Sequence, residues 1–165
     1  MGTGLPGETT SERSLVPRIV REAHVSWEGT AARGSGVVSA SSSGAFELPF
    51  TIASRIGNPE GKTSPEELLA AAHASCFVTS LGGELARAGT PPQHLDVHCT
   101  ITMDEVEGKG HRIVSSAIAA RGTASGADAA TFAQAAEAAD AGCPFSALIK
   151  ASATVTINAT LEGGT

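Results

Sequence analysis

One long apolar segment, which begins at Ser64 and ends at Gly89, limits the possible folds of this chain more than any other feature. Ser64 is a preferred N-cap residue, Pro65 suits the first helical position, and Glu67 completes a capping box three residues after the cap. The residues that follow are apolar around most of the helical girth, which is typical of a helix buried on nearly all sides. The sequence therefore predicts a central buried helix that ends at Gly89.

Alternation of apolar and polar residues predicts strands on both sides of this helix, over residues 19–27, 37–38, 45–48, 50–53, 95–103, 111–120 and 155–161. An Ala-rich second helix is expected over 127–141, and Cys143-Pro144 is expected to open a short third helix. The order strands, helix, strands, helix, strand indicates an α+β fold with antiparallel sheets. We expect residues 1–17 to be a disordered leader and residues 18–165 to form a single domain.

Composition excludes several classes of protein. The 165 residues, 41% of them hydrophobic, suffice for one domain with a core. A formal net charge of −6 without a basic stripe argues against nucleic acid as a partner. No apolar run of 18 residues and no secretory signal are evident, so we expect no membrane span and a cytoplasmic location. No glycine-rich phosphate loop opens a helix, and no cofactor is expected.

Three cysteines are the residues with the most reactive side chains, and they are too few to form a disulfide scaffold. Cys76 lies in the middle of the apolar helix, where a thiol is more often a small core side chain. Cys143 immediately precedes Pro144 at a helix start, where backbone N–H groups stabilise a thiolate, although a weak N-cap is an equal alternative. Cys99 alternates with polar neighbours and is expected to serve packing.

Metal binding is the main alternative use of these thiols. The chain contains no Cys-x-x-Cys pair, and His73 is the one histidine placed on the same helix face as Cys76. Two ligands alone make a weak zinc site, so we expect no metal. We expect His73 to be a helix-interface residue rather than a general base.

Two separated motifs carry a resemblance to a known family. Residues 64–76 read Ser-Pro-Glu-Glu-Leu-Leu-Ala-Ala-Ala-His-Ala-Ser-Cys, and residues 142–146 read Gly-Cys-Pro-Phe-Ser. Together they resemble the signatures of the OsmC/Ohr family of thiol-dependent organic hydroperoxide reductases, over about residues 18–163 of the chain. The chain resembles the OsmC branch more than the Ohr branch at Trp27-Glu28-Gly29, Arg33 and Arg55.

The resemblance implies an OsmC-like fold, in which antiparallel sheets wrap around two central buried helices in an intertwined homodimer. It implies that Cys76 attacks the peroxide, that Cys143 resolves the product as a disulfide, and that an external dithiol then reduces this disulfide. Arg55 and Glu66 match the polar pair of the family. Arg33 matches an arginine in the turn between the first two strands, and the Ohr branch uses that arginine instead. Whether Arg55 or Arg33 activates Cys76 therefore stays open. A role in oxidative or osmotic stress defence is also implied.

The chemistry itself requires a cation near the attacking sulfur. A free thiol with a pKa of about 8.5 is only a few per cent ionised at pH 7, and burial raises the pKa further. Arginine stays charged when partly desolvated, and a carboxylate such as Glu66 can orient it through a bidentate pair. Glu66 lies ten residues before Cys76 on one helix, about 15 Å away, so a shared site requires Glu66 from the other subunit.

Apolar side chains near these motifs suit a hydrophobic peroxide better than hydrogen peroxide. The candidate pocket walls are Phe77, Phe145, Leu69 and Ile56, and core packing is an equal alternative for the two phenylalanines. Two other functions compete with the peroxidase. One is a non-catalytic dimeric binding module for an apolar ligand, and the other is a thiol redox sensor or a structural zinc protein.

Overall fold

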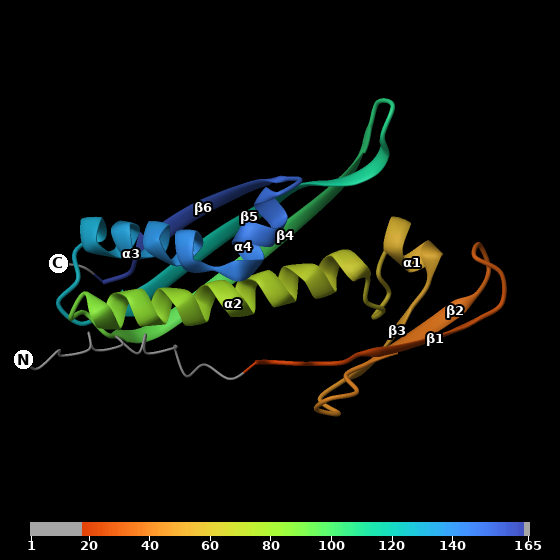
Figure 1. Ribbon diagram of the computed structural model, residues 1–165, viewed down its shortest axis with the longest axis horizontal. Coiled ribbons are helices and arrows are strands. Elements are labelled where there is room, and N and C mark those ends of the chain that lie inside the picture. The colour runs from red at the N-terminus through yellow and green to blue at the C-terminus, as the bar shows by residue number, and fades with distance from the viewer. Residues whose placement is uncertain (1–17, 164–165) are drawn as a thin grey trace, which may run out of the picture.

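The computed structural model describes residues 18–163, which form two three-stranded sheets and four helices (Figure 1). The predicted leader, residues 1–17, lies outside the described residues. The elements in chain order are β1 (His24–Glu28), β2 (Ser35–Ser39), β3 (Glu47–Phe50), α1 (Ile52–Ile56), α2 (Pro65–Arg87), β4 (Pro92–Val106), β5 (Gly110–Ala124), α3 (Ala129–Gly142), α4 (Pro144–Lys150) and β6 (Thr154–Leu161).

The first sheet is an antiparallel meander of β1, β2 and β3 that lies beyond the N-terminal end of α2 (Figure 1). The prediction of a strand over residues 50–53 is wrong, because the chain turns into α1 directly after Phe50. Thr51 caps this short helix by accepting a hydrogen bond from the Ser54 backbone N–H at 2.9 Å, and the Ser54 hydroxyl accepts from the Thr51 N–H at 3.1 Å. This reciprocal cap starts a helix although Thr51 and Ile52 are both β-branched.

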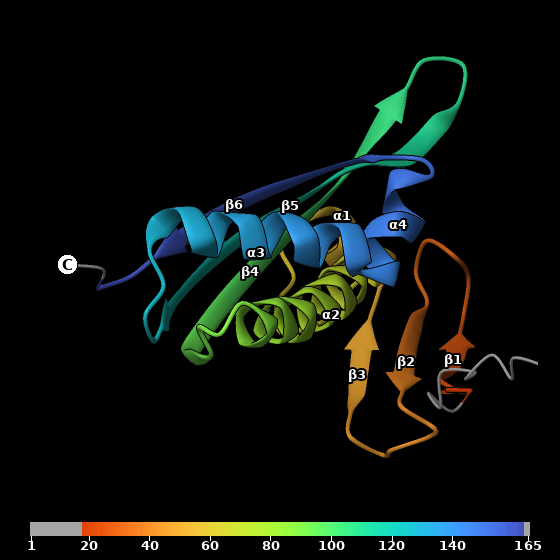
Figure 2. The same cartoon turned by 60° about the vertical axis from the view of Figure 1, so that its left-hand side comes forward.

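The second sheet has the order β4-β5-β6, with an antiparallel β4–β5 pair. The expectation of antiparallel pairing fails for one strand, because β6 runs parallel to β5. The physical reason is the connection: α3 and α4 cross one face of the sheet between β5 and β6, and such a crossover returns the chain in its original direction. Figure 2 shows α3 lying across the sheet.

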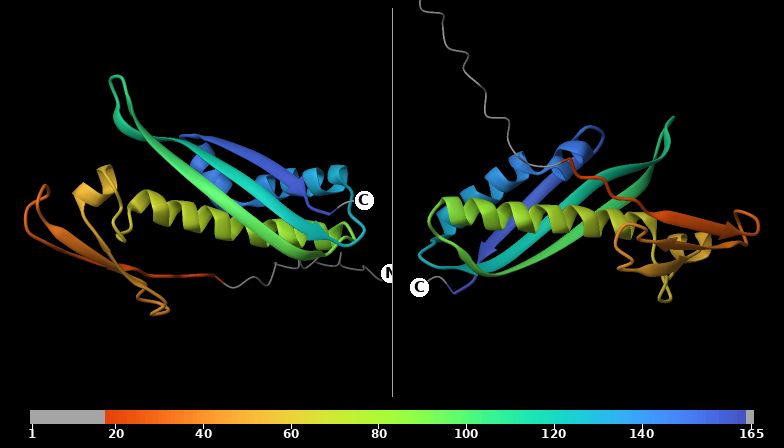
Figure 3. Two further views of the ribbon diagram at one scale, coloured as in Figure 1. Left: turned by 180° about the vertical axis from the view of Figure 1, so that it is seen from behind. Right: turned by 60° about the horizontal axis from the view of Figure 1, so that its bottom comes forward.

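Helix α2 packs against this sheet and α3 through one face. The buried side chains on α2 recur every four residues, at His73, Phe77, Leu81 and Leu85. The last three of these meet Phe132 and a series of buried alanines on α3, whose small side chains let the two helices approach closely. Figure 3 shows the two helices side by side along the sheet from behind. The α+β architecture agrees with the prediction.

The opposite face of α2 is not covered within the chain. Ala71, Ser75 and Thr79 are exposed, so the prediction of burial on nearly all sides is wrong for the single chain. By composition α2 is also long and apolar enough to cross a bilayer, with a mean hydropathy of 1.2 over its most apolar window. Length and composition alone do not make α2 a membrane span, because core helices of soluble proteins meet the same criterion. The packing of its buried face against α3 and the second sheet is that of a core helix.

The ends of α2 lie where the sequence predicts them, but the predicted capping box at its first turn is only half formed. The Ser64 hydroxyl accepts a hydrogen bond from the Glu67 backbone N–H at 3.2 Å. The Glu67 carboxylate, however, accepts from the Thr63 hydroxyl at 2.8 Å instead of closing a capping box on Ser64. At the other end Gly89 takes a φ of +75°, the left-handed conformation that commonly terminates a helix.

We expect Phe132→Ala to lower the free energy of unfolding by about 3–5 kcal/mol, because it leaves a cavity between α2 and α3. Phe132 is fully buried in the core. Phe46→Ala is the matched control, since Phe46 is 39% exposed and its loss removes less buried apolar contact than the loss of Phe132. Urea unfolding followed by circular dichroism measures both. Equal losses for the two variants would contradict this description of the core.

Candidate active site

The structure brings two of the three cysteines together. Cys76 lies on α2 and Cys143 is the N-cap of α4, as the sequence indicated, and their sulfurs are 3.1 Å apart. A disulfide requires about 2.05 Å, so a shift of about 1 Å closes the bond. The two thiols differ in access, because Cys143 is 1% exposed and Cys76 is only half-buried. Cys76 is therefore the sulfur that a molecule from solvent reaches first.

The environment of Cys76 within one chain favours the neutral thiol. Burial raises the pKa of Cys76, and the adjacent Cys143 thiol raises it further. The Phe145 backbone N–H and the Ser80 hydroxyl act in the opposite direction by stabilising the thiolate, but the net pKa shift is upward. Reactivity at neutral pH therefore requires a further positive charge near this sulfur.

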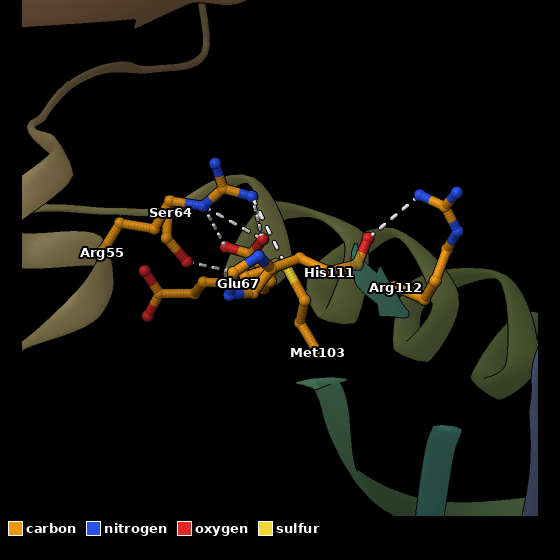
Figure 4. Close-up of polar contacts among 7 residues, drawn as sticks. Arg55, Ser64, Glu67, Met103, His111 and Arg112 are labelled. Carbon is orange, nitrogen blue, oxygen red and sulfur yellow. Dashed lines mark hydrogen bonds and ion pairs between the residues drawn. The ribbon is translucent and has the colours of Figure 1, made fainter. Parts of the chain in front are cut away.

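Arg55 on α1 and Glu66 on α2 form a second polar cluster (Figure 4). Arg55 Nε donates to both Glu66 carboxylate oxygens at 3.1 Å, and Arg55 Nη2 also donates to Oε1. This bonding lowers the pKa of Glu66 and keeps its carboxylate charged. Arg55 Nη2 also lies 3.6 Å from the Met103 sulfur on β4, a neighbour that the sequence gave no reason to expect.

The two clusters are separate within one chain. Glu66 and Cys76 are ten positions apart on α2, a rise of about 15 Å along the helix. The chain thus pairs Cys76 with Cys143 and Arg55 with Glu66, but it does not place the arginine beside the sulfur.

The remaining candidates occupy different environments. Arg33 is exposed in the β1–β2 turn, and its side chain makes no hydrogen bond or ion pair with residues 18–163. Phe77 is fully buried in the core, so its burial supports packing rather than a pocket wall. Phe145 and Leu69 are half-buried, and Ile56 is 80% exposed.

A buried histidine forms a network that sequence reasoning missed. His73 Nδ1 lies 2.8 Å from Ser116 Oγ, and His73 Nε2 lies 2.8 Å from Ser146 Oγ. Ser116 Oγ is in turn 3.3 Å from the Cys99 sulfur, which packs against the core as expected. Both ring nitrogens are occupied, so His73 is an interface residue and not a base for Cys76. The serines lie on β5 and α4, far from His73 in sequence, and no local signal connects them.

The hydrogen bonds of His73 are also relevant to the alternative that Cys76 and His73 bind zinc. The ring nitrogens of His73 face serines rather than Cys76. Within residues 18–163, no group of three or more His, Cys, Asp or Glu side chains is arranged to hold a metal ion.

The buried imidazole should make stability depend on pH. Burial lowers the pKa of His73 below its ordinary 6.5, with Asp140 opposing this shift and Lys150 adding to it. Below pH 6.5 the unfolded chain therefore binds a proton that the folded chain refuses, and stability falls as pH decreases toward the folded pKa. We expect His73→Gln to reduce this slope between pH 7 and 5 in urea unfolding. His98→Gln, at an exposed position on β4, is the control. An unchanged slope in His73→Gln would contradict the assignment.

The chain resembles known proteins over most of its length. It matches the family model described as OsmC-like protein over residues 57–158. It is 36% identical over 137 residues to Peroxiredoxin OsmC of Escherichia coli (strain K12), covering 83% of this chain and 94% of that protein. Similar solved structures include the organic hydroperoxide resistance protein OsmC of Legionella pneumophila, with a TM-score of 0.66, 19% identity and coverage of 87% and 98% of the two chains.

The organic hydroperoxide resistance protein OhrB of Bacillus subtilis is also similar, with a TM-score of 0.65, 19% identity and coverage of 84% and 97%. These two structural likenesses show the fold. The match to the family model covers more than half of the chain, and the identity to the Escherichia coli protein extends over nearly all of that relative. The resemblance seen in the two motifs is thereby confirmed, and the chain belongs to the OsmC family.

Proposed function

We propose that this protein is a thiol-dependent peroxidase that reduces organic hydroperoxides to alcohols, with Cys76 as the attacking and Cys143 as the resolving cysteine. The contact that carries the proposal is the 3.1 Å separation of the two sulfurs. Their unequal exposure supports the order, because peroxide reaches the half-buried Cys76 more easily than the enclosed Cys143. The names of the relatives, peroxiredoxin and organic hydroperoxide resistance protein, agree with this chemistry.

The reaction proceeds in two steps on the protein. The Cys76 thiolate attacks the outer oxygen of the hydroperoxide, the O–O bond breaks, and the alkoxide takes a proton and leaves as an alcohol. Cys76 is now a sulfenic acid. The Cys143 thiolate then attacks the Cys76 sulfur, hydroxide leaves and becomes water, and the disulfide forms. An external dithiol returns both cysteines to thiols, so no resident cofactor is required.

The first step requires a positive charge beside Cys76, and within a single chain the Arg55 guanidinium does not lie there. Arg55 suits this role better than Arg33, because the Glu66 carboxylate holds its guanidinium in place. We place the partner subunit's Arg55 beside Cys76 in a homodimer. In this arrangement Arg55 offsets the burial of Cys76, favours its thiolate and stabilises the departing alkoxide.

The exposed face of α2 supports such a dimer. An antiparallel copy of α2, with its two-fold level with Ala71, brings the partner subunit's Glu66 level with Cys76, because residue 71 lies midway between 66 and 76. Ala71 is exposed and begins a stripe of small side chains that continues through Ser75 and Thr79. A groove of about 500 Å³ lies beside Ala71 between α2 and the first sheet. The uncovered part of α2 thus carries small side chains that leave room for a second helix to pack closely.

Half-buried Phe145 and Leu69 are the side chains that we propose to face an alkyl substituent. An apolar lining favours a bulky alkyl hydroperoxide over hydrogen peroxide. We place the activity in the cytoplasm, in defence against oxidative stress. A redox sensor would form the same disulfide, but it would reduce peroxide far more slowly than a peroxidase does.

We expect Cys76→Ser to abolish turnover of cumene hydroperoxide with dithiothreitol, because the attacking sulfur is lost. Without dithiothreitol, Cys143→Ser should reduce one equivalent of peroxide and then retain a sulfenic acid that dimedone traps. Cys99→Ser is the matched control and should retain turnover, since Cys99 does not contact the sulfur pair. A wild-type protein that binds cumene hydroperoxide without reducing it would support the binding-module alternative and refute the peroxidase.

Subunit complementation tests the shared site. Cys76→Ser and Arg55→Gln homodimers should each be nearly inactive, because each lacks one component of both sites. After unfolding and refolding of an equal mixture, half of the dimers are mixed and contain one intact site. We therefore expect about a quarter of the wild-type turnover to return. The absence of any recovery, with mixed dimers demonstrated by mass spectrometry, would place the arginine and the cysteine in the same chain.

A further inference from the structure

Two contacts join α2 and α4 at neighbouring positions. His73 meets Ser146 at 2.8 Å, and Cys76 meets Cys143 at 3.1 Å. On each helix the two members are three residues apart and share one face. The pairing 73 with 146 and 76 with 143 means that the helices run antiparallel here. The polar contact therefore lies about one helical turn from the sulfur contact.

Helix α4 has few other anchors. It spans only seven residues, which is too short to be stable without tertiary contacts. Cys143 is its N-cap but makes no side-chain hydrogen bond to the first turn. Its buried residues are Ser146 and Ile149, and an ion pair from Lys150 to Asp140 of α3 lies at its far end. The bond from His73 is thus the polar anchor nearest to Cys143.

We infer that His73 is a positioning residue, whose hydrogen bond to Ser146 docks α4 on α2 and keeps Cys143 within bonding reach of Cys76. Its importance for turnover rests on the proposed function, but its effect on the pairing of the two sulfurs does not.

The second step of the proposed reaction explains why such an anchor matters. When Cys76 becomes a sulfenic acid, Cys143 attacks its sulfur from the side opposite the S–O bond, starting from a separation of 3.1 Å. Cys143 must move about 1 Å closer to form the disulfide. An anchor one turn away allows the first turn of α4 to move while the rest of the helix stays docked.

His73 itself supplies a matched control. Its second bond, to Ser116 on β5, has the same 2.8 Å length, and both serines are fully buried. Ser146→Ala and Ser116→Ala therefore remove equivalent hydroxyls from the same imidazole. Only Ser146 belongs to the helix that carries Cys143.

The experiment measures the Cys76–Cys143 equilibrium in glutathione redox buffers, with the dithiol and disulfide forms quantified after acid quenching and alkylation. We expect Ser146→Ala to lower the effective concentration of the two thiols about three- to tenfold, the size expected for one lost hydrogen bond. Ser116→Ala should stay within about twofold of the wild type, although we expect urea unfolding to show a similar loss of stability in both variants. His73→Phe keeps a planar ring but removes both bonds, and it should match Ser146→Ala.

An unchanged equilibrium in Ser146→Ala, or equal shifts in the two serine variants, would overturn the positioning role and leave only general core stability. If Ser146→Ala does not fold, His73→Phe replaces it, and its Cys76–Cys143 equilibrium is compared with that of Ser116→Ala in the same way. The glutathione measurement involves no peroxide. A failure of the positioning role can therefore be distinguished from a failure of the proposed peroxidase function. A wild-type protein that pairs its thiols but does not reduce hydroperoxides would refute the peroxidase alone. In a working peroxidase, Ser146→Ala should slow disulfide closure while dimedone trapping shows an unchanged rate of Cys76 oxidation.

Discussion

The packing of one face of α2 against α3 and the second sheet determines where every reactive group lies. Phe77 is fully buried in this contact, and Cys76 precedes it by one residue, about 100° around the helix. Cys76 therefore lies at the edge of the buried face rather than inside it. From this edge it meets Cys143 at the start of α4 and still remains half-exposed. A change in the rotation of α2 would separate the sulfurs or enclose them.

This position creates two opposing requirements. Burial brings the sulfurs together and shields a disulfide, but it also raises the pKa of Cys76 and lowers its reactivity. We propose that the Arg55–Glu66 pair meets the second requirement by supplying a positive charge, yet the length of α2 keeps it about 15 Å from Cys76 in the same chain. Association of two chains through the exposed face of α2 would resolve the conflict. In this proposal catalysis and assembly depend on the same helix.

Local signals accounted for much of the fold and for part of the site. Ser64 and Gly89 marked the ends of α2 closely, and the cap at Cys143 followed from Pro144, because capping depends on neighbouring residues. Helix α1 was missed, since its cap at Thr51 is an uncommon reciprocal pair with serine. The parallel placement of β6 depends on how two helices cross the sheet, which no periodicity records. The His73 network joins α2, β5 and α4, and long-range contacts of this kind leave no mark in sequence spacing.

The account depends most on the contact between the two sulfurs. Peptide mapping by mass spectrometry, after one equivalent of cumene hydroperoxide is added to the reduced protein, tests this contact directly. The account predicts one dominant product, a disulfide that links the peptides of Cys76 and Cys143 within one chain, with Cys99 still a free thiol. Oxidation that leaves Cys76 unchanged, or a disulfide that joins it to Cys99 instead, would contradict it.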